Sequence, residues 1–115
     1  ADAGKIISEK TARSQMVGGA VGGIGMAMTE ETLLDHRYGR YINSNFVDYH
    51  VPVHADVPPM DIVFTNQPDY IISPTGAKGI GEIALVGVAP AILNAVYNAT
   101  GKRVRDLPVT PDKLI

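Results

Sequence analysis

The chain has 115 residues, 45% of them apolar and 19% charged, a composition typical of a globular domain and not of a disordered segment. Its formal net charge of −2 supplies no basic footprint for nucleic acid or for an anionic membrane. The absence of cysteine excludes disulfides, thiolate zinc sites and a cysteine nucleophile; we expect a cytoplasmic location, with the periplasm as the alternative. The length is sufficient for a buried core. Because the chain opens without Met, we interpret it as a fragment of a longer protein.

The first long element is a predicted helix from Thr11 to about Thr29, which Ser8 or Thr11 could cap. Apolar residues recur in it at three- and four-residue spacing, as expected for one face of a helix. Five glycines also lie inside it, at positions 18, 19, 22, 23 and 25. Each costs about 0.5–1 kcal/mol relative to alanine in a helix interior. The sequence therefore predicts that something packs against this bare backbone at close range, and a bound cofactor is one way to use the room.

Three segments after this helix read as strands: residues 32–41, 46–55 and 58–66. In the last of them Met60, Ile62 and Phe64 alternate with other residues, which is the period of a strand with one buried face. Prolines at 52, 58 and 59 interrupt the region, so we expect some of these segments to be edge strands or extended connections.

A second helix is predicted from Glu82 to Gly101. Its residues are apolar on most sides, which predicts burial in a core, while Pro90 predicts a kink and Gly101 a C-cap. A Thr110-capped turn with Pro111 at its first position is expected near the end of the chain. The fold class predicted is α+β: a two-layer sandwich of a mixed or antiparallel sheet with two main helices, with residues 1–115 forming one part of a larger domain.

The common ligand-binding and catalytic patterns are mostly absent. Neither glycine-rich segment has the order of a dinucleotide or phosphate-loop fingerprint. His50 and His54 would share one face of an extended strand as a candidate zinc pair, but no third ligand stands at useful spacing, and packed histidines are the commoner explanation. No serine has a histidine placed in a recognisable nucleophile motif.

The stretch "GAKGIGE", residues 76–82, is the strongest candidate site. Glu82 would stand at a helix start, where the helix dipole favours an ionised carboxylate by about 0.3–1 kcal/mol. The glycines before it leave its oxygens open, and the backbone N–H groups of the turn could bind an anionic or carbonyl-bearing group. A general base beside a cofactor is one interpretation; a helix-capping glutamate is the other.

Three stretches, in the same order along the chain, resemble the C-terminal part of the molybdopterin-binding large subunit of the xanthine dehydrogenase and aldehyde oxidoreductase family, the molybdenum hydroxylases. They are "TARSQMVGGAVGGIGMAMTEE", "VDYHVPVHADVPPMDI" and "GAKGIGEIALVGVAPAILNAVYNATGKRVRDLPVTPDKLI". Together they cover nearly the whole chain.

The resemblance implies roles for six residues. Glu82 corresponds to the family's catalytic base, which deprotonates Mo–OH. Gln15 corresponds to the glutamine that hydrogen-bonds near the cofactor, and Lys78, Gly79, Ile80 and Gly81 would lie with their backbone against the molybdenum–pterin; no residue is expected to ligate the metal directly. The implied reaction is hydroxylation of an aldehyde or a purine-like N-heterocycle with water as the oxygen source.

The resemblance also implies cofactors and partners. The pterin would be in its cytosine dinucleotide form, and FAD and [2Fe-2S] clusters would lie on other domains or subunits. Partners would be the rest of the molybdenum subunit and the iron–sulfur and FAD subunits, with no nucleic acid or membrane and with self-association through exposed apolar surface. Gly22 stands where many relatives have glutamine, and Ile83-Ala84 replaces a proline pair, which indicates a bacterial-type enzyme. The fragment alone should be inactive; a stand-alone pterin- or nucleotide-binding module without catalysis is the alternative.

Overall fold

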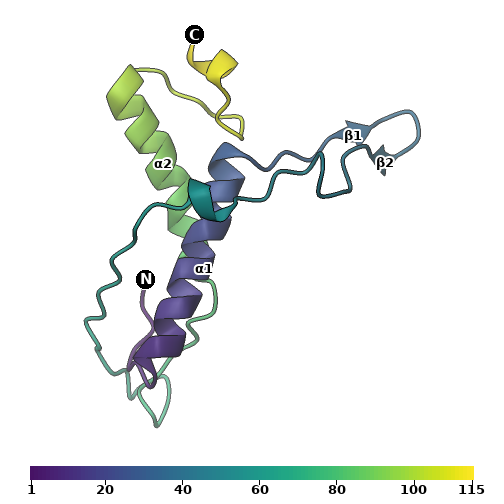
Figure 1. The fold of residues 1–115 in the computed structure, drawn as a ribbon. Coiled ribbons are helices and arrows are strands. Elements are labelled where there is room, and N and C mark those ends of the chain that lie inside the picture. The colour runs from purple at the N-terminus through teal and green to yellow at the C-terminus, as the bar shows by residue number, and fades with distance from the viewer.

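The computed structural model describes all 115 residues as two long helices joined by mostly irregular chain (Figure 1). Helix α1 spans Glu9–Met28 and helix α2 spans Leu85–Thr100. Between them, strands β1 (Leu34–Asp35) and β2 (Arg40–Tyr41) form an antiparallel hairpin. Two short 3₁₀ helices, η1 (His54–Asp56) and η2 (Pro111–Leu114), complete the set. The α+β class and the two main helices are confirmed.

The glycine-rich helix exists because α2 packs directly on its backbone. An alanine Cβ built at Gly23 would lie 2.5 Å from Val88 Cβ, and one at Gly22 would lie 2.9 Å from Leu85 Cδ1. One at Gly19 would lie 3.0 Å from both the carbonyl oxygen of Glu82 and the amide nitrogen of Leu85. The prediction of a close neighbour is confirmed. The room left by these three glycines is filled by the start of α2. The expectation that a cofactor uses this room is therefore wrong for these three positions.

The sheet is smaller than the sequence predicts. Leu34 pairs with Tyr41 and Asp35 with Arg40, and the hairpin projects away from the two helices (Figure 1), so the expected sheet layer is reduced to this hairpin. The predicted strands at 46–55 and 58–66 are wrong as paired strands. Prolines there remove backbone donors, and no second strand of the chain lies alongside to complete a ladder.

Residues 60–65 nevertheless keep the alternating burial expected of a strand. Met60, Ile62 and Phe64 are half-buried, whereas the three residues alternating with them are exposed. Their backbone groups make no ladder hydrogen bonds; the one bond recorded here runs from the Arg13 guanidinium to the Met60 carbonyl oxygen, at 2.9 Å. The predicted period of two is therefore present in a segment that has no partner strand within the chain.

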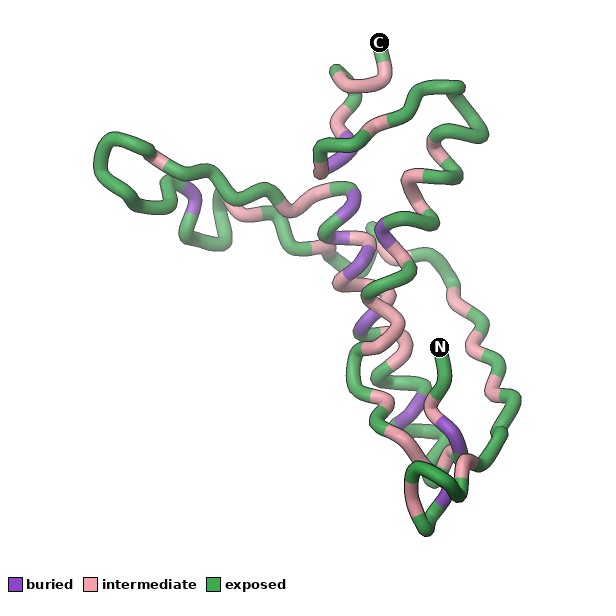
Figure 2. The backbone as a smooth tube through the Cα atoms, turned by 180° about the vertical axis from the view of Figure 1, so that it is seen from behind, coloured by how far each residue is buried: buried purple, intermediate pink, exposed green.

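The chain is open and has almost no core. Only 11 of 115 residues are buried, and the apolar ones among them are Ala12, Ala27, Ala89 and Val109 (Figure 2). The accessible surface is 8335 Å², whereas a compact monomer of this mass exposes about 6,100 Å². The radius of gyration is 17.5 Å, against about 13 Å for a compact domain of this length.

The expected burial of α2 is therefore wrong for this chain. Its first turns pack on α1, but Val86 and Tyr97 are exposed, because nothing else in the chain covers the outer faces of the helix. The helix continues through Pro90 and ends at Gly101, whose φ of 72° confirms the predicted C-cap. The Thr110–Pro111 turn is confirmed as the start of η2. Neither long helix has the length and apolar character needed to cross a membrane.

Candidate functional site

The loop of residues 76–82 is held in place by the N-terminal segment. The Lys5 amide donates to the Gly76 carbonyl oxygen at 2.8 Å, and the Lys78 amide donates to the Ala3 carbonyl oxygen at 2.9 Å. Gly4 and Ala77 form the antiparallel bridge between the two segments. Gly76 has a φ of 73°, a conformation that glycine adopts without strain. The loop is therefore fixed at its beginning by residues more than 70 positions earlier in the chain.

The side chain of Lys78 strengthens this attachment. Its Nζ lies 2.6 Å from Asp2 Oδ2 and 2.7 Å from Asp69 Oδ2. These bonds from Lys78 lower the pKa of both carboxyl groups, with smaller help from the backbone amides of Gly4 and Ile72. The two carboxylates in turn raise the pKa of Lys78, Asp2 more than Asp69. Neither acidic partner was predicted from the sequence, because nothing in the local pattern links positions 2, 69 and 78.

The later part of the loop presents a row of unused backbone donors. The amides of Gly79, Ile80, Gly81 and Glu82 donate to no acceptor in the chain. A Cβ added at Gly79 or Gly81 would meet nothing within 4 Å. Four successive amides beside open space form a site that oxygen atoms of an anionic or carbonyl-bearing group can occupy.

Glu82 does not cap helix α2. The helix begins three residues later, at Leu85, and its N-cap position is Ala84, with no side-chain capping bond. Residues 80–85 instead form tight turns in which Ile83 and Leu85 donate to the carbonyl oxygens three residues earlier. The Glu82 carboxylate is exposed and has no hydrogen-bond partner in the chain. The capping interpretation is therefore wrong, and the predicted helix start at Glu82 moves to Leu85.

The carboxylate of Glu82 lies over α1. A Cβ added at Gly18 would be 3.9 Å from Glu82 Oε1, so Gly18 faces the carboxylate while Gly19 faces the Glu82 backbone. Gln15 precedes these two glycines by three and four residues, which places it on the same face of the helix. The fold thus brings Gln15 and Glu82, 67 positions apart, to one side of α1.

Three of the predicted residues line a pocket of about 290 Å³. It lies between the N-terminal segment, the start of α1 and the loop, and Gln15, Lys78 and Ile80 all contribute to its wall. Ser8 and Thr11 add hydroxyl groups to it. The Gln15 carboxamide and the Ser8 hydroxyl have no partner in the chain and can bond to a polar group there, whereas the Thr11 hydroxyl donates to the Ser8 carbonyl oxygen at 3.2 Å. Of the four free loop amides, only that of Ile80 belongs to a residue of this wall.

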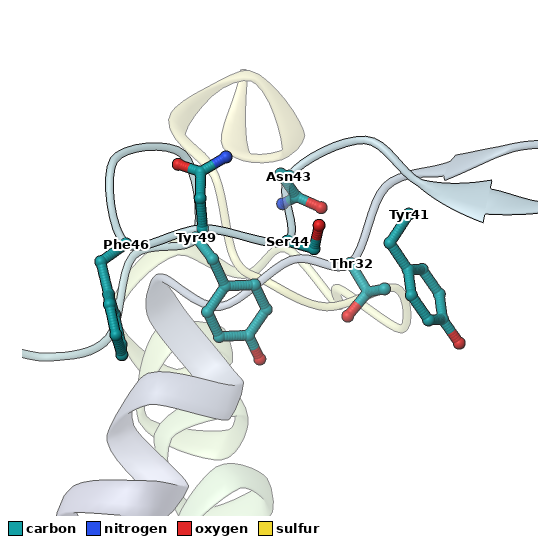
Figure 3. Close-up of a pocket in the computed structure, with 7 residues that line it drawn as sticks. Thr32, Tyr41, Asn43, Ser44, Phe46 and Tyr49 are labelled. Carbon is teal, nitrogen blue, oxygen red and sulfur yellow. The ribbon is translucent and has the colours of Figure 1, made fainter.

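A larger hollow lies elsewhere, beyond the end of α1. It measures about 510 Å³ and none of the predicted residues lines it (Figure 3). Phe46 at its edge is almost fully exposed, whereas the Tyr49 hydroxyl donates to Glu30 Oε2 at 2.7 Å. The hollow is lined by Thr32, Tyr41, Asn43, Ser44, Asn45, Phe46 and Tyr49.

The histidine pair does not have its predicted geometry. His54 opens the 3₁₀ helix η1, so it does not share a strand face with His50. No group of three histidine, cysteine, aspartate or glutamate side chains is placed to hold a metal ion.

Comparison with known proteins gives consistent matches. Residues 1–58 match the family model described as the molybdopterin cofactor-binding domain. The chain is 52% identical over 113 residues to the aldehyde oxidoreductase molybdenum-binding subunit PaoC of Escherichia coli strain K12, covering 98% of this chain and 15% of that subunit. It is 39% identical over 115 residues to the putative xanthine dehydrogenase molybdenum-binding subunit XdhA of the same strain, again covering 98% of this chain and 15% of the relative.

Solved structures agree with these matches. The crystal structure of quinoline 2-oxidoreductase from Pseudomonas putida 86 superposes with a TM-score of 0.86 at 29% identity, covering 97% of this chain and 14% of that one. The chain thus spans about one seventh of the length of the relatives it matches. By the family model, the sequence identity and the shared fold, the chain belongs to the molybdopterin cofactor-binding domain family and corresponds to a segment of the molybdenum-binding subunit of the xanthine oxidase family.

Proposed function

We propose that this chain supplies the general base and one wall of the cofactor site in a molybdenum hydroxylase that oxidises an aldehyde or an N-heterocycle with water as the oxygen source. The observation that carries the proposal is the position of Glu82 and the freedom of its carboxylate. Its carboxylate is exposed, caps no helix, bonds to nothing in the chain and stands directly after the unused amides of residues 79–81. Other exposed glutamates of the chain, such as Glu31, also lack a side-chain partner; Glu82 differs from them in its position after these free amides and over Gly18.

The residues proposed to hold the cofactor are those with free donors on the loop and on the adjacent face of α1. The amides of Gly79, Ile80 and Gly81 can donate to cofactor oxygens, and the carboxamide of Gln15 can donate and accept from the α1 side. Lys78 also lines the pocket, but its amide and its ammonium group are already bonded within the chain. When bound, the molybdenum–pterin supplies the redox chemistry, and the protein supplies position and proton transfer.

Glu82 would act at its side-chain oxygens. An ionised carboxylate that is open on one side and bonded to no group of its own chain can accept a proton from the oxygen nucleophile beside it. General base catalysis of this kind contributes typically about 10²–10⁴ in rate. Gly18, which faces the carboxylate without a side chain, leaves the approach from α1 open.

The surface of the chain supports a place inside a larger assembly. It exposes about 2,200 Å² more than a compact monomer of its mass, and the backbone of residues 60–65 makes no hydrogen bond to other backbone groups of the chain. We propose that the remainder of a molybdenum subunit covers these surfaces, that FAD and [2Fe-2S] clusters on other domains or subunits carry the electrons away, and that the pterin is in its cytosine dinucleotide form. The chain alone would then be inactive.

The test is Glu82→Gln in a molybdenum subunit that contains this segment. Because glutamine keeps the volume and removes the base, we expect turnover to fall by about 10²-fold or more while molybdenum and pterin content stay at the wild-type level. Glu31→Gln is the matched control, since Glu31 is also an exposed glutamate but lies beyond the C-terminal end of α1. Full activity of the Glu82→Gln variant with normal metal content would contradict the proposal. A wild-type protein that binds pterin and oxidises no aldehyde or heterocycle would instead favour a binding module.

A further inference from the structure

The Lys78 ammonium joins three parts of the chain. Asp2 belongs to the N-terminal segment, Asp69 to the turn that precedes the glycine-rich loop, and Lys78 to the loop itself. Each carboxylate also accepts backbone bonds in its own segment with its other oxygen: Asp2 Oδ1 from the Gly4 amide, and Asp69 Oδ1 from the amides of Ile71 and Ile72. Both carboxylates are therefore oriented before they meet the lysine.

The same three segments share a single carbonyl oxygen. The Gly76 carbonyl accepts from the Lys5 amide at 2.8 Å and from the Asp69 amide at 2.9 Å, so backbone and side chains form one closed cluster. About a quarter of the Lys78 side chain is exposed, and a similar fraction of that of Asp69. An ion pair that is partly shielded from water and fixed by other bonds orients its loop better than an isolated surface pair does.

We infer that Lys78 is a positioning residue: with Asp2 and Asp69 it forms a charged clamp that fixes the direction in which the free amides of residues 79–82 point. The clamp lies immediately before those amides. The amides themselves donate to no acceptor in the chain, so no hydrogen bond of their own orients them. Without it, the loop keeps only the backbone bonds of Gly76 and Lys78 to the N-terminal segment before the free amides, and the turn bonds at Ile83 and Leu85 after them. The role in cofactor retention rests on the proposed function above, whereas the role in holding the loop does not.

The first arm of the test needs no cofactor. Amide hydrogen exchange is measured for Lys5 and Lys78, whose bonds to Gly76 and Ala3 close only when the loop is docked. We expect Lys78→Met to speed exchange of both amides several-fold, Lys78→Arg to restore most of the protection, and Asp69→Asn to act like Lys78→Met. Asparagine keeps the Oδ1 acceptor and the volume, so Asp69→Asn tests the charge even if Lys78→Met fails to fold. Lys102→Met, at a lysine whose side chain has no partner in the chain, is the control.

The second arm measures molybdenum and pterin content of the purified subunit that carries these variants. We expect Lys78→Met and Asp69→Asn to lower cofactor content by about tenfold, as removal of supporting bonds around a bound group commonly does, with recovery in Lys78→Arg. Unchanged exchange in both variants would overturn the clamp. Faster exchange with full cofactor content would overturn its positioning role. Activity of Glu82→Gln is scored separately, so failure of the base assignment is not confused with failure of the clamp.

Discussion

The molecule contains two groups of glycines that do opposite work. In α1, side chains at Gly19, Gly22 and Gly23 would collide with the start of α2, so glycine there permits contact. In the loop, side chains at Gly79 and Gly81 would meet nothing of the chain, so glycine there leaves space beside unused amides, and at Gly81 the φ of 32° also favours glycine. The same residue type thus marks a packed interface in one place and an open site in the other. The atoms that would surround an added Cβ distinguish the two cases.

The largest effect that tests this comparison is expected for Gly23→Ala. The new Cβ would lie 2.5 Å from Val88 Cβ, so the two helices must separate. We expect a destabilisation of about 1–3 kcal/mol, the usual range for overpacking, although alanine is the better helix former. Chemical denaturation measures it. An unchanged or raised stability would contradict the assignment of this glycine to the interface.

Gly79→Ala tests the other side of the comparison. Nothing in the chain lies near the added methyl group, so the free energy of unfolding should change by less than about 0.5 kcal/mol. The methyl would instead stand beside the proposed cofactor amides, and we expect molybdenum content of the assembled subunit to fall several-fold. Normal metal content together with normal stability would mean that the open space at this glycine has no ligand.

Acid should loosen the loop before it loosens the contact between α1 and α2, because ion pairs hold the loop and apolar packing holds the helices. The pKa values of Asp2 and Asp69 are lowered in the folded chain. Their contribution to the stability of the docked loop is therefore present above about pH 4 and is lost as pH falls through the lowered values. The pKa of Lys78 is raised, so its contribution is present below about pH 10 and is lost as pH rises through the raised value. We expect protection of the Lys5 and Lys78 amides to disappear in acid before that of amides in the middle of α1, in exchange data corrected for intrinsic rates.

A small effect of opposite sign to that of Gly23→Ala is expected for Gly87→Ala in α2. This glycine is exposed within the helix, and an added Cβ would meet nothing. Alanine should therefore stabilise the chain by about 0.5–1 kcal/mol through helix propensity alone. If Gly87→Ala raises the free energy of unfolding and Gly23→Ala lowers it under the same conditions, then the contacts around each glycine, and not the number of glycines, determine the effect on stability.

The sequence predicts those features that depend on neighbouring residues. The spacing in α1, the stop at Gly101 and the turn at Pro111 all follow from local chemistry, and the structure confirms them. The energetic cost of five glycines also predicted a close neighbour for α1. It did not identify that neighbour as the first turns of α2, because the contact joins residues more than 60 positions apart.

Features that depend on distant partners were missed or wrong. Residues 58–66 have the period of a strand, but pairing needs a second strand that the chain does not place beside them. The burial expected for α2 fails for the same reason, since its apolar faces have no covering layer. The clamp at Lys78 depends on Asp2, 76 positions away. The roles of Gln15, Glu82 and the loop amides remain predictions that the geometry makes testable.

The contact between the two helices also sets an order of events during synthesis. Helix α1 carries five glycines and cannot be stable as an isolated helix. Its stabilising neighbour includes Val88, which the ribosome adds 60 residues after Met28. Within this chain, α1 is therefore at most a fluctuating helix until α2 docks on it. Because Glu82 lies just before α2, the docking of α2 that stabilises α1 also brings the proposed base onto the surface of α1. The helix pair and the candidate site therefore form in the same step.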